Sequence, residues 1–153
     1  MPAVPHPPTA RIALAALVLF TALVVAAARP APADALTRSE SRLFRVVNDV
    51  RRDHGAHRVR VGSKIQGAAH HWARYLRRHN SFYHGRMASG TAEIIGWVSC
   101  RRGWARTIAR MWLNSSGHRP HLLDRSARRV GVGVNTGRWS GYGCVRMAVV
   151  RLR

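Results

Sequence analysis

The sequence predicts an α+β layered domain in which helices cover a small antiparallel sheet. Apolar residues recur at spacings of three and four between residues 37 and 112, which is typical of amphipathic helices. From residue 129 the apolar spacing changes to two, which is typical of strands. Because the strands come last and are too few for a sandwich of two sheets, we expect the helices to pack over them.

Three helices are expected. Thr37 and Glu40 have the spacing of a capping box, and the apolar residues behind them predict a helix that ends near Gly55. A second helix is expected to begin at a Ser63 cap and to stop at Asn80, with arginines on the face opposite its apolar residues. The third helix follows the positions Trp104, Ile108, Met111 and Trp112.

Three strands are expected. The segment AEIIGWVS, residues 92–99, predicts the first. After residue 129, valines alternate with glycines in VGVGV, the segment NTGRWSG supplies a turn, and YGCVRMAVVRL follows. This order predicts a β-hairpin.

The beginning of the chain has the pattern of an export signal. An uncharged apolar run from Ile12 to Ala28 follows Arg11, and the small residues Ala31 and Ala33 have the spacing that a signal peptidase recognises. We therefore expect a signal peptide over residues 1–33 and a single secreted, monomeric domain over residues 34–153. An uncleaved membrane anchor is the alternative, because a run of this length is close to the minimum that spans a bilayer.

Two cysteines occur, Cys100 and Cys144, and both lie in the part expected to be exported. An oxidising compartment favours their pairing as a disulfide. The alternative is a pair of buried free thiols.

The chain is strongly basic, with 26 Lys and Arg residues against 6 Asp and Glu residues and a formal net charge of +20. The arginines are spread along the chain and are not gathered in a tail. Such a charge attracts polyanions, so anionic lipids and acidic envelope polymers are the expected partners, with peripheral membrane contact only. No zinc-finger spacing, RNP-like strand or basic region with heptads is present, so no specific nucleic-acid partner is expected.

Candidate functional side chains come from nine histidines and one isolated glutamate. Glu93 is the only acidic residue between Asp53 and Asp124. His84 and His118 stand out among the histidines because each lies in a loop near a helix end, where side chains converge on clefts.

Four segments occur in the order of a known family: FYH at 82–84, AEI at 92–94, MWLNSSGHR at 111–119 and VGVGV at 130–134. With these segments the chain resembles, from about Thr37 to Arg153, the CAP superfamily of SCP-like extracellular proteins (cysteine-rich secretory protein, antigen 5, pathogenesis-related 1), and its bacterial branch in particular. The resemblance implies an α-β-α sandwich with a surface cleft. It also implies two histidines and acidic residues that face each other across the cleft and hold a divalent metal in some members.

By this resemblance, His84 and His118 match the two cleft histidines and Glu93 matches the glutamate of a Gly-Glu-Asn segment. The sequence differs from the family around these positions. Ala92 and Ile94 flank the glutamate, Ser115 lies near the place of a second glutamate, and His121 replaces an asparagine of the bacterial pattern.

Two interpretations of this trio remain open. His84, His118 and Glu93 match a zinc ligand set in number and type. Alternatively, they form a hydrogen-bonded polar cluster in which Glu93 orients a histidine.

Three functions follow. The preferred hypothesis is a secreted binding module without catalytic residues, which acts at anionic envelope or extracellular surfaces through the His/Glu cleft, because the resemblance implies no single agreed reaction. The first alternative is a zinc-dependent hydrolase. The second is a cationic membrane-active or antimicrobial protein that uses its second helix.

Overall fold

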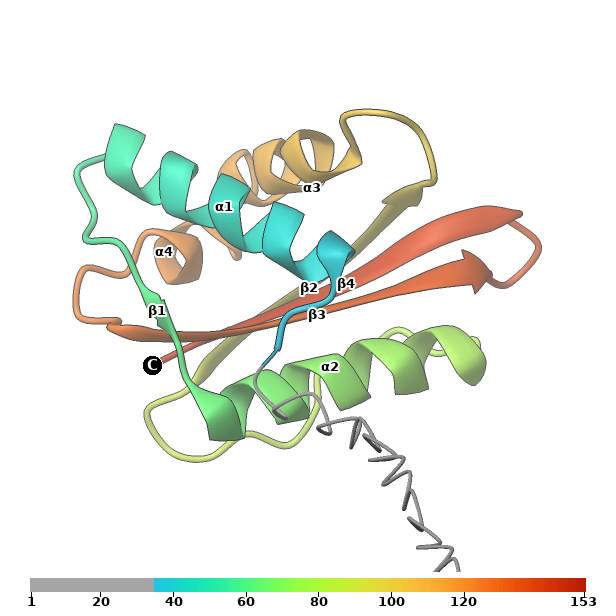
Figure 1. The fold of residues 1–153 in the computed structure, drawn as a ribbon, viewed down its shortest axis with the longest axis horizontal. Helices are drawn as coiled ribbons and strands as arrows, with labels where there is room; N and C mark the ends of the chain where they lie inside the picture. Colours follow the sequence, from blue (N-terminus) through green and yellow to red (C-terminus); the bar gives the residue numbers. More distant parts are fainter. Residues whose placement is uncertain (1–34) are drawn as a thin grey trace, which may run out of the picture. The chain divides into compact units, whose positions relative to one another are not determined.

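The computed structural model describes residues 35–153, which form a sheet covered by helices on both faces. In chain order the elements are α1 (Arg38–Asp53), β1 (Arg60–Val61), α2 (Ser63–Arg78), β2 (Ala92–Ser99), α3 (Trp104–Leu113), α4 (Arg119–Leu122), β3 (Arg129–Arg138) and β4 (Cys144–Leu152). Figure 1 shows α2 on one side of the sheet and α1, α3 and α4 on the other. The α-β-α sandwich expected from the resemblance is therefore confirmed.

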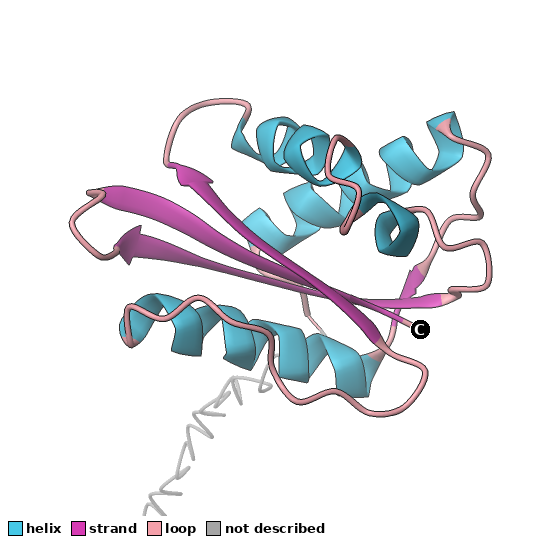
Figure 2. Cartoon of the chain, turned by 180° about the vertical axis from the view of Figure 1, so that it is seen from behind, coloured by secondary structure: helices cyan, strands magenta, loops and turns pink. Residues whose placement is uncertain are grey.

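The sheet has the strand order β1-β3-β4-β2. The β3–β4 hairpin and the β2–β4 pair are antiparallel, as expected, whereas the two-residue strand β1 pairs in parallel with β3. The sheet is therefore mixed and not purely antiparallel. The strand β2 lies at the opposite edge from β1 (Figure 2).

The helix boundaries test the expected caps. The Thr37–Glu40 capping box is present in both directions at the start of α1. The expected Ser63 cap is wrong, because Gly62 is the N-cap of α2 and no side chain caps that helix. The helix α2 ends at Arg78, and Asn80, where a stop was expected, has a positive φ of 49°.

The short helix α4 and strand β1 were not expected, since four and two residues are too few for a periodic signal. The hairpin turn also differs from the expectation. The residues 135–138 of NTGRWSG continue β3, and the chain reverses over residues 139–143.

Glycines in β3 bring α2 close to the sheet. A Cβ atom at Gly131 or Gly133 would collide with the backbone of α2 at Ile65 or Ala69. The alternating valines of the same strand point to the other face, where they join the core beneath α1 and α3. The VGVGV segment therefore contacts the helices on both faces of the sheet. Its glycines allow α2 to pack closely on one face, and its valines fill the main core on the other.

The predicted disulfide is present between Cys100 and Cys144. It links the end of β2 to the start of β4, next to the backbone hydrogen bond from Cys100 N to Cys144 O at 3.1 Å. The expected export signal, residues 1–33, lies outside the described residues. None of the helices within residues 35–153 combines the length and the apolar character needed to cross a bilayer.

Candidate binding cleft

Glu93 lies at the start of β2 and is almost fully buried. Arg151 of β4 stands opposite it in the antiparallel register, and Arg151 Nε lies 2.7 Å from Glu93 Oε2. The backbone N–H of Gly85 donates to Glu93 Oε1 at 2.9 Å. Both carboxylate oxygens are therefore held by the protein, and the buried negative charge is balanced by a buried guanidinium.

His84 lies in the loop between α2 and β2, and its Nδ1 is 3.1 Å from Glu93 Oε1. About half of the His84 side chain is exposed. The next residue must be small, because a Cβ atom at Gly85 would lie 2.7 Å from Arg151 Nη2 and 3.0 Å from the Trp72 ring. The loop thus packs tightly on the ion pair, and Glu93 orients His84 at the surface.

His118 is the N-cap residue of α4. Its Nδ1 lies 2.9 Å from Ser115 Oγ, which also accepts from the His118 backbone N–H at 3.3 Å. Partial burial lowers the pKa of His118, and the nearby His84 and His121 lower it further. The structure therefore brings His84 and Glu93 into contact, and it places His118 against Ser115 without a hydrogen bond to Glu93.

Across residues 35–153, no group of three or more His, Cys, Asp or Glu side chains is arranged to hold a metal ion. The two oxygens of Glu93 already have hydrogen-bond partners, and one of these is the cationic Arg151. A cation at the carboxylate would face that guanidinium. The arrangement does not fit a zinc site, and the ligand set of His84, His118 and Glu93 stays a prediction without geometric support.

A cavity of about 620 Å³ lies next to His118, and we call it the edge groove. The strand segment 95–99 of β2 forms one wall of the groove. The remaining lining residues are Phe82, Thr107, Met111, Trp112, Ser115 and His118. Phe82 is 47% exposed and Met111 is 50% exposed, so the groove presents apolar side chains to solvent.

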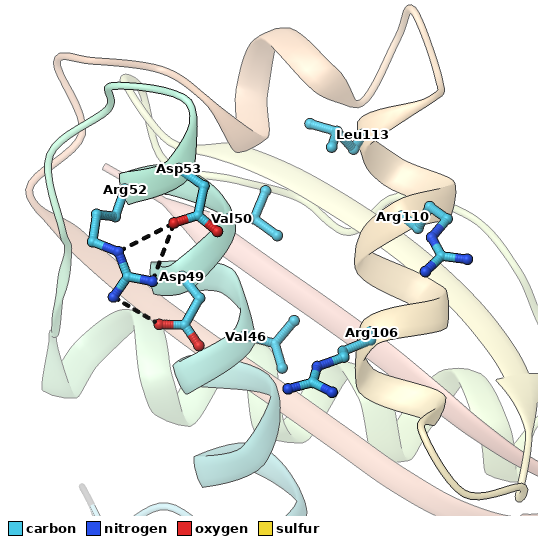
Figure 3. A pocket seen from close by; sticks show the side chains of 8 residues that line it. All are labelled: Val46, Asp49, Val50, Arg52, Asp53, Arg106, Arg110 and Leu113. Carbon is cyan, nitrogen blue, oxygen red and sulfur yellow. Dashed lines mark hydrogen bonds and ion pairs between the residues drawn. The ribbon is translucent and has the colours of Figure 1, made fainter.

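A second groove, of about 390 Å³, runs between α1 and α3 (Figure 3). Its α3 side carries Arg106 and Arg110. On its α1 side, Arg52 forms ion pairs with Asp49 and Asp53 at 3.2 and 3.1 Å, so the two carboxylates of that wall are already engaged. The two arginines of α3 have no such partner among the described residues.

Sequence reasoning did not find Arg151 or the arginines of α3. Arg151 is one of 25 arginines and has no distinguishing neighbour in the sequence. Only its position opposite Glu93 in the sheet register identifies it. Arg106 and Arg110 carried a usable signal, since residues four apart on a helix share one face.

Comparisons with known proteins agree with this architecture. The family model of the cysteine-rich secretory protein family, CAP, matches residues 44–150. A search of curated proteins finds no match. Among solved structures, an outer surface protein from Borrelia burgdorferi is 14% identical, with a TM-score of 0.58, over 77% of this chain and 94% of that chain.

Two further structures show the same fold. An extracellular protein containing an SCP domain from Bacillus anthracis is 17% identical, with a TM-score of 0.57, over 77% of this chain and 44% of that chain. The protein MpPR-1i is 16% identical, with a TM-score of 0.54, over 77% of this chain and 90% of that chain. At these identities the similarity establishes the fold alone.

Proposed function

Because the chain belongs to the cysteine-rich secretory protein (CAP) family, we propose that it is an exported binding module that recognises anionic polymers or lipid headgroups at envelope or extracellular surfaces. The observation that carries this proposal is the excess of unpaired arginine on the surface. Within residues 35–153, Arg52 and Arg151 are the only arginines that form ion pairs with carboxylates. Most of the others are exposed and remain available to an external anion.

The acidic residues cannot neutralise this surface. Glu40 and Glu93 are buried. Asp49 and Asp53 bind Arg52, and Asp124 accepts hydrogen bonds from Ser126 at 2.7 and 2.8 Å. A surface of one sign attracts polyanions over several ångströms, and the attraction weakens with salt.

The groove between α1 and α3 brings arginines without carboxylate partners together around a hollow. Arg106 and Arg110 line it from α3, and an adjoining hollow of about 320 Å³ adds Arg42 and Arg45 from α1. Guanidinium groups bind phosphate and carboxylate oxygens in pairs of hydrogen bonds. We therefore assign the electrostatic contact to this groove, and we assign recognition of a bound group to the candidate cleft at His84 and His118, where the buried Glu93 orients His84.

The two alternative functions have less support. A metal-dependent hydrolase needs a ligand set and an open coordination position, and Glu93 is already committed to Arg151, Gly85 and His84. A membrane-active role for α2 would need its apolar face free, yet Ala69, Ala73 and Leu76 are buried against the sheet.

Vesicle binding tests the proposal. The protein should bind vesicles containing phosphatidylglycerol and should not bind pure phosphatidylcholine vesicles. Binding should collapse between low salt and about 0.5 M NaCl, where screening is reduced to a few ångströms. Equal binding to both vesicle types, or binding unchanged by salt, would refute electrostatic recognition.

Two double variants of equal charge separate the groove from net charge. Arg106→Gln/Arg110→Gln removes two charges from the groove, and Arg74→Gln/Arg78→Gln removes two exposed charges with the same spacing from α2. A larger loss of affinity for the first variant would support the groove between α1 and α3 as the anion-binding site. Equal losses would assign the binding to overall charge alone and refute that site.

A further inference from the structure

Among residues 35–153, no strand pairs with the outer edge of β2. β2 is the last strand in the order β1-β3-β4-β2, and Figure 2 shows no further strand beside it. In an antiparallel pair, alternate residues direct their N–H and C=O groups to the partner strand, and the residues between them direct these groups outward. The backbone N–H of Cys100 donates to the Cys144 carbonyl, so Cys100 directs its backbone groups to β4. Because the direction alternates along the strand, the N–H and C=O groups of the even-numbered residues of β2 point to β4.

The odd-numbered residues therefore face outward, and one side-chain contact agrees with this. The indole Nε1 of Trp112, which packs beside β2, donates to the Ile95 carbonyl at 3.0 Å. The Ser99 carbonyl accepts from Arg101 N at 2.8 Å. The N–H and C=O of Trp97, midway between them, have no partner among the described residues.

These outward groups line the edge groove. Five consecutive residues of β2, Ile95 to Ser99, form its wall, with Phe82 on one side of the edge and Met111 of α3 on the other. Backbone donors and acceptors at the centre, flanked by exposed apolar side chains, are the features that an added strand requires. Main-chain hydrogen bonds would hold such a strand, and the flanking side chains would receive its apolar residues.

We propose that the outer edge of β2 binds an extended acidic peptide as an additional strand of the sheet. The distance from Ile95 to Ser99 along a strand is about 13 Å, which corresponds to about five peptide residues. The surface charge selects an acidic partner, and the exposed Arg101 and Arg102 lie just beyond Cys100, past the end of β2. The same charge opposes edge-to-edge pairing with a second copy of this chain. The inference goes beyond the proposed function, because its ligand is a peptide and its contacts are backbone hydrogen bonds.

Hydrogen exchange tests the backbone contacts. The probe is the synthetic peptide DEVTVTVED, and its control is DEVPVPVED, which has the same charge but loses two backbone donors and resists strand pairing. With the first peptide at saturation, amide exchange at Ile95, Trp97 and Ser99 should slow about ten-fold or more. The amides of the intervening residues, already bonded to β4, should change little. The proline peptide should bind at least about ten-fold more weakly.

Matched variants test the apolar contacts. Met111→Gln should weaken peptide binding about five-fold, because a half-exposed methionine becomes buried in the complex. Met87→Gln changes another exposed methionine that does not line the groove, and it should have no effect beyond about two-fold.

Three results would overturn the inference: uniform exchange across β2, equal affinity for the proline peptide, or sedimentation showing that the edge pairs with a second copy. Its failure is distinguishable from failure of the proposed function. Vesicle binding depends on arginine charge and salt, whereas the alternating exchange pattern depends on the free edge.

Discussion

Replacing Arg51 by methionine is expected to lower the free energy of unfolding by about 3–5 kcal/mol. Arg51 is completely buried near the end of α1. Its guanidinium donates to the backbone carbonyls of His57 at 2.8 Å, Leu122 at 2.7 Å, Asp124 at 2.9 Å and Ala127 at 3.5 Å. One side chain thus joins α1 to the segment that connects α4 with β3.

The magnitude follows from these contacts. A hydrogen bond to a charged group contributes about 1.5–3 kcal/mol, and three of the four are short. Loss of the donor would also leave buried carbonyls without partners, at about 1–3 kcal/mol each. Removal of a desolvated charge offsets part of the loss, since burial lowers the pKa of Arg51. The net value is therefore well below the sum.

Urea denaturation followed by tryptophan fluorescence measures the change, and the neighbouring arginine provides the control. Arg52 is 55% exposed and forms surface ion pairs with Asp49 and Asp53. Arg52→Met should cost less than about 1 kcal/mol, because exposed ion pairs contribute little. Methionine and arginine have similar helix propensities, so the comparison isolates the buried contacts. Equal midpoints for the two variants would refute the reasoning.

Three further predictions concern the disulfide and the cleft. The Cys100–Cys144 disulfide closes a loop with a sequence separation of 44, so its reduction should lower the free energy of unfolding by about 4 kcal/mol. In calorimetry the melting temperature should fall by about 15 °C or more, and an unchanged melting temperature would contradict this. Glu93→Gln should cost about 3–5 kcal/mol in chemical denaturation, because it leaves Arg151 buried without a counter-charge, and metal content by plasma spectrometry should not change. Folding lowers the pKa of His118. As the pH falls through and below the usual histidine value of about 6.5, His118 therefore binds more protons in the unfolded chain than in the folded one. The wild type should therefore lose stability relative to His118→Gln between about pH 7 and pH 5, and parallel stability curves would rule this out.

Much of the fold could be predicted from local pattern. The capping box at Thr37 and Glu40 satisfies its own helix end, so no distant contact is needed to specify it. The alternation of valine and glycine in β3 similarly predicts which face of the strand carries small side chains and which carries large ones. The Ser63 prediction failed because Gly62 occupies the cap position, and a single shift by one residue removes the side-chain bond.

Burial of individual charges could not be predicted in this way. Arg51 and Arg52 are adjacent and chemically identical, yet one is buried and the other is exposed. The difference comes from carbonyls that lie more than 70 residues further along the chain. The same holds for Glu40, whose capping role was visible in the sequence but whose second contact, from Oε1 to His70 Nδ1 at 2.7 Å, joins α1 to α2 across the layers.

The cleft itself shows how one substitution changes the chemistry of its neighbours. Ser115 lies near the place where the family resemblance puts a second glutamate, and its hydroxyl, not a carboxylate, contacts His118. A neutral partner does not favour the imidazolium, while burial and the nearby His84 and His121 disfavour it, so the pKa of His118 lies below its usual value. The charge of the buried Glu93 is balanced by Arg151 and not by the histidines alone. His118 therefore lies against a neutral hydroxyl while the charge of Glu93 is compensated by Arg151, so the proposed attraction of anions rests on the arginines around these residues.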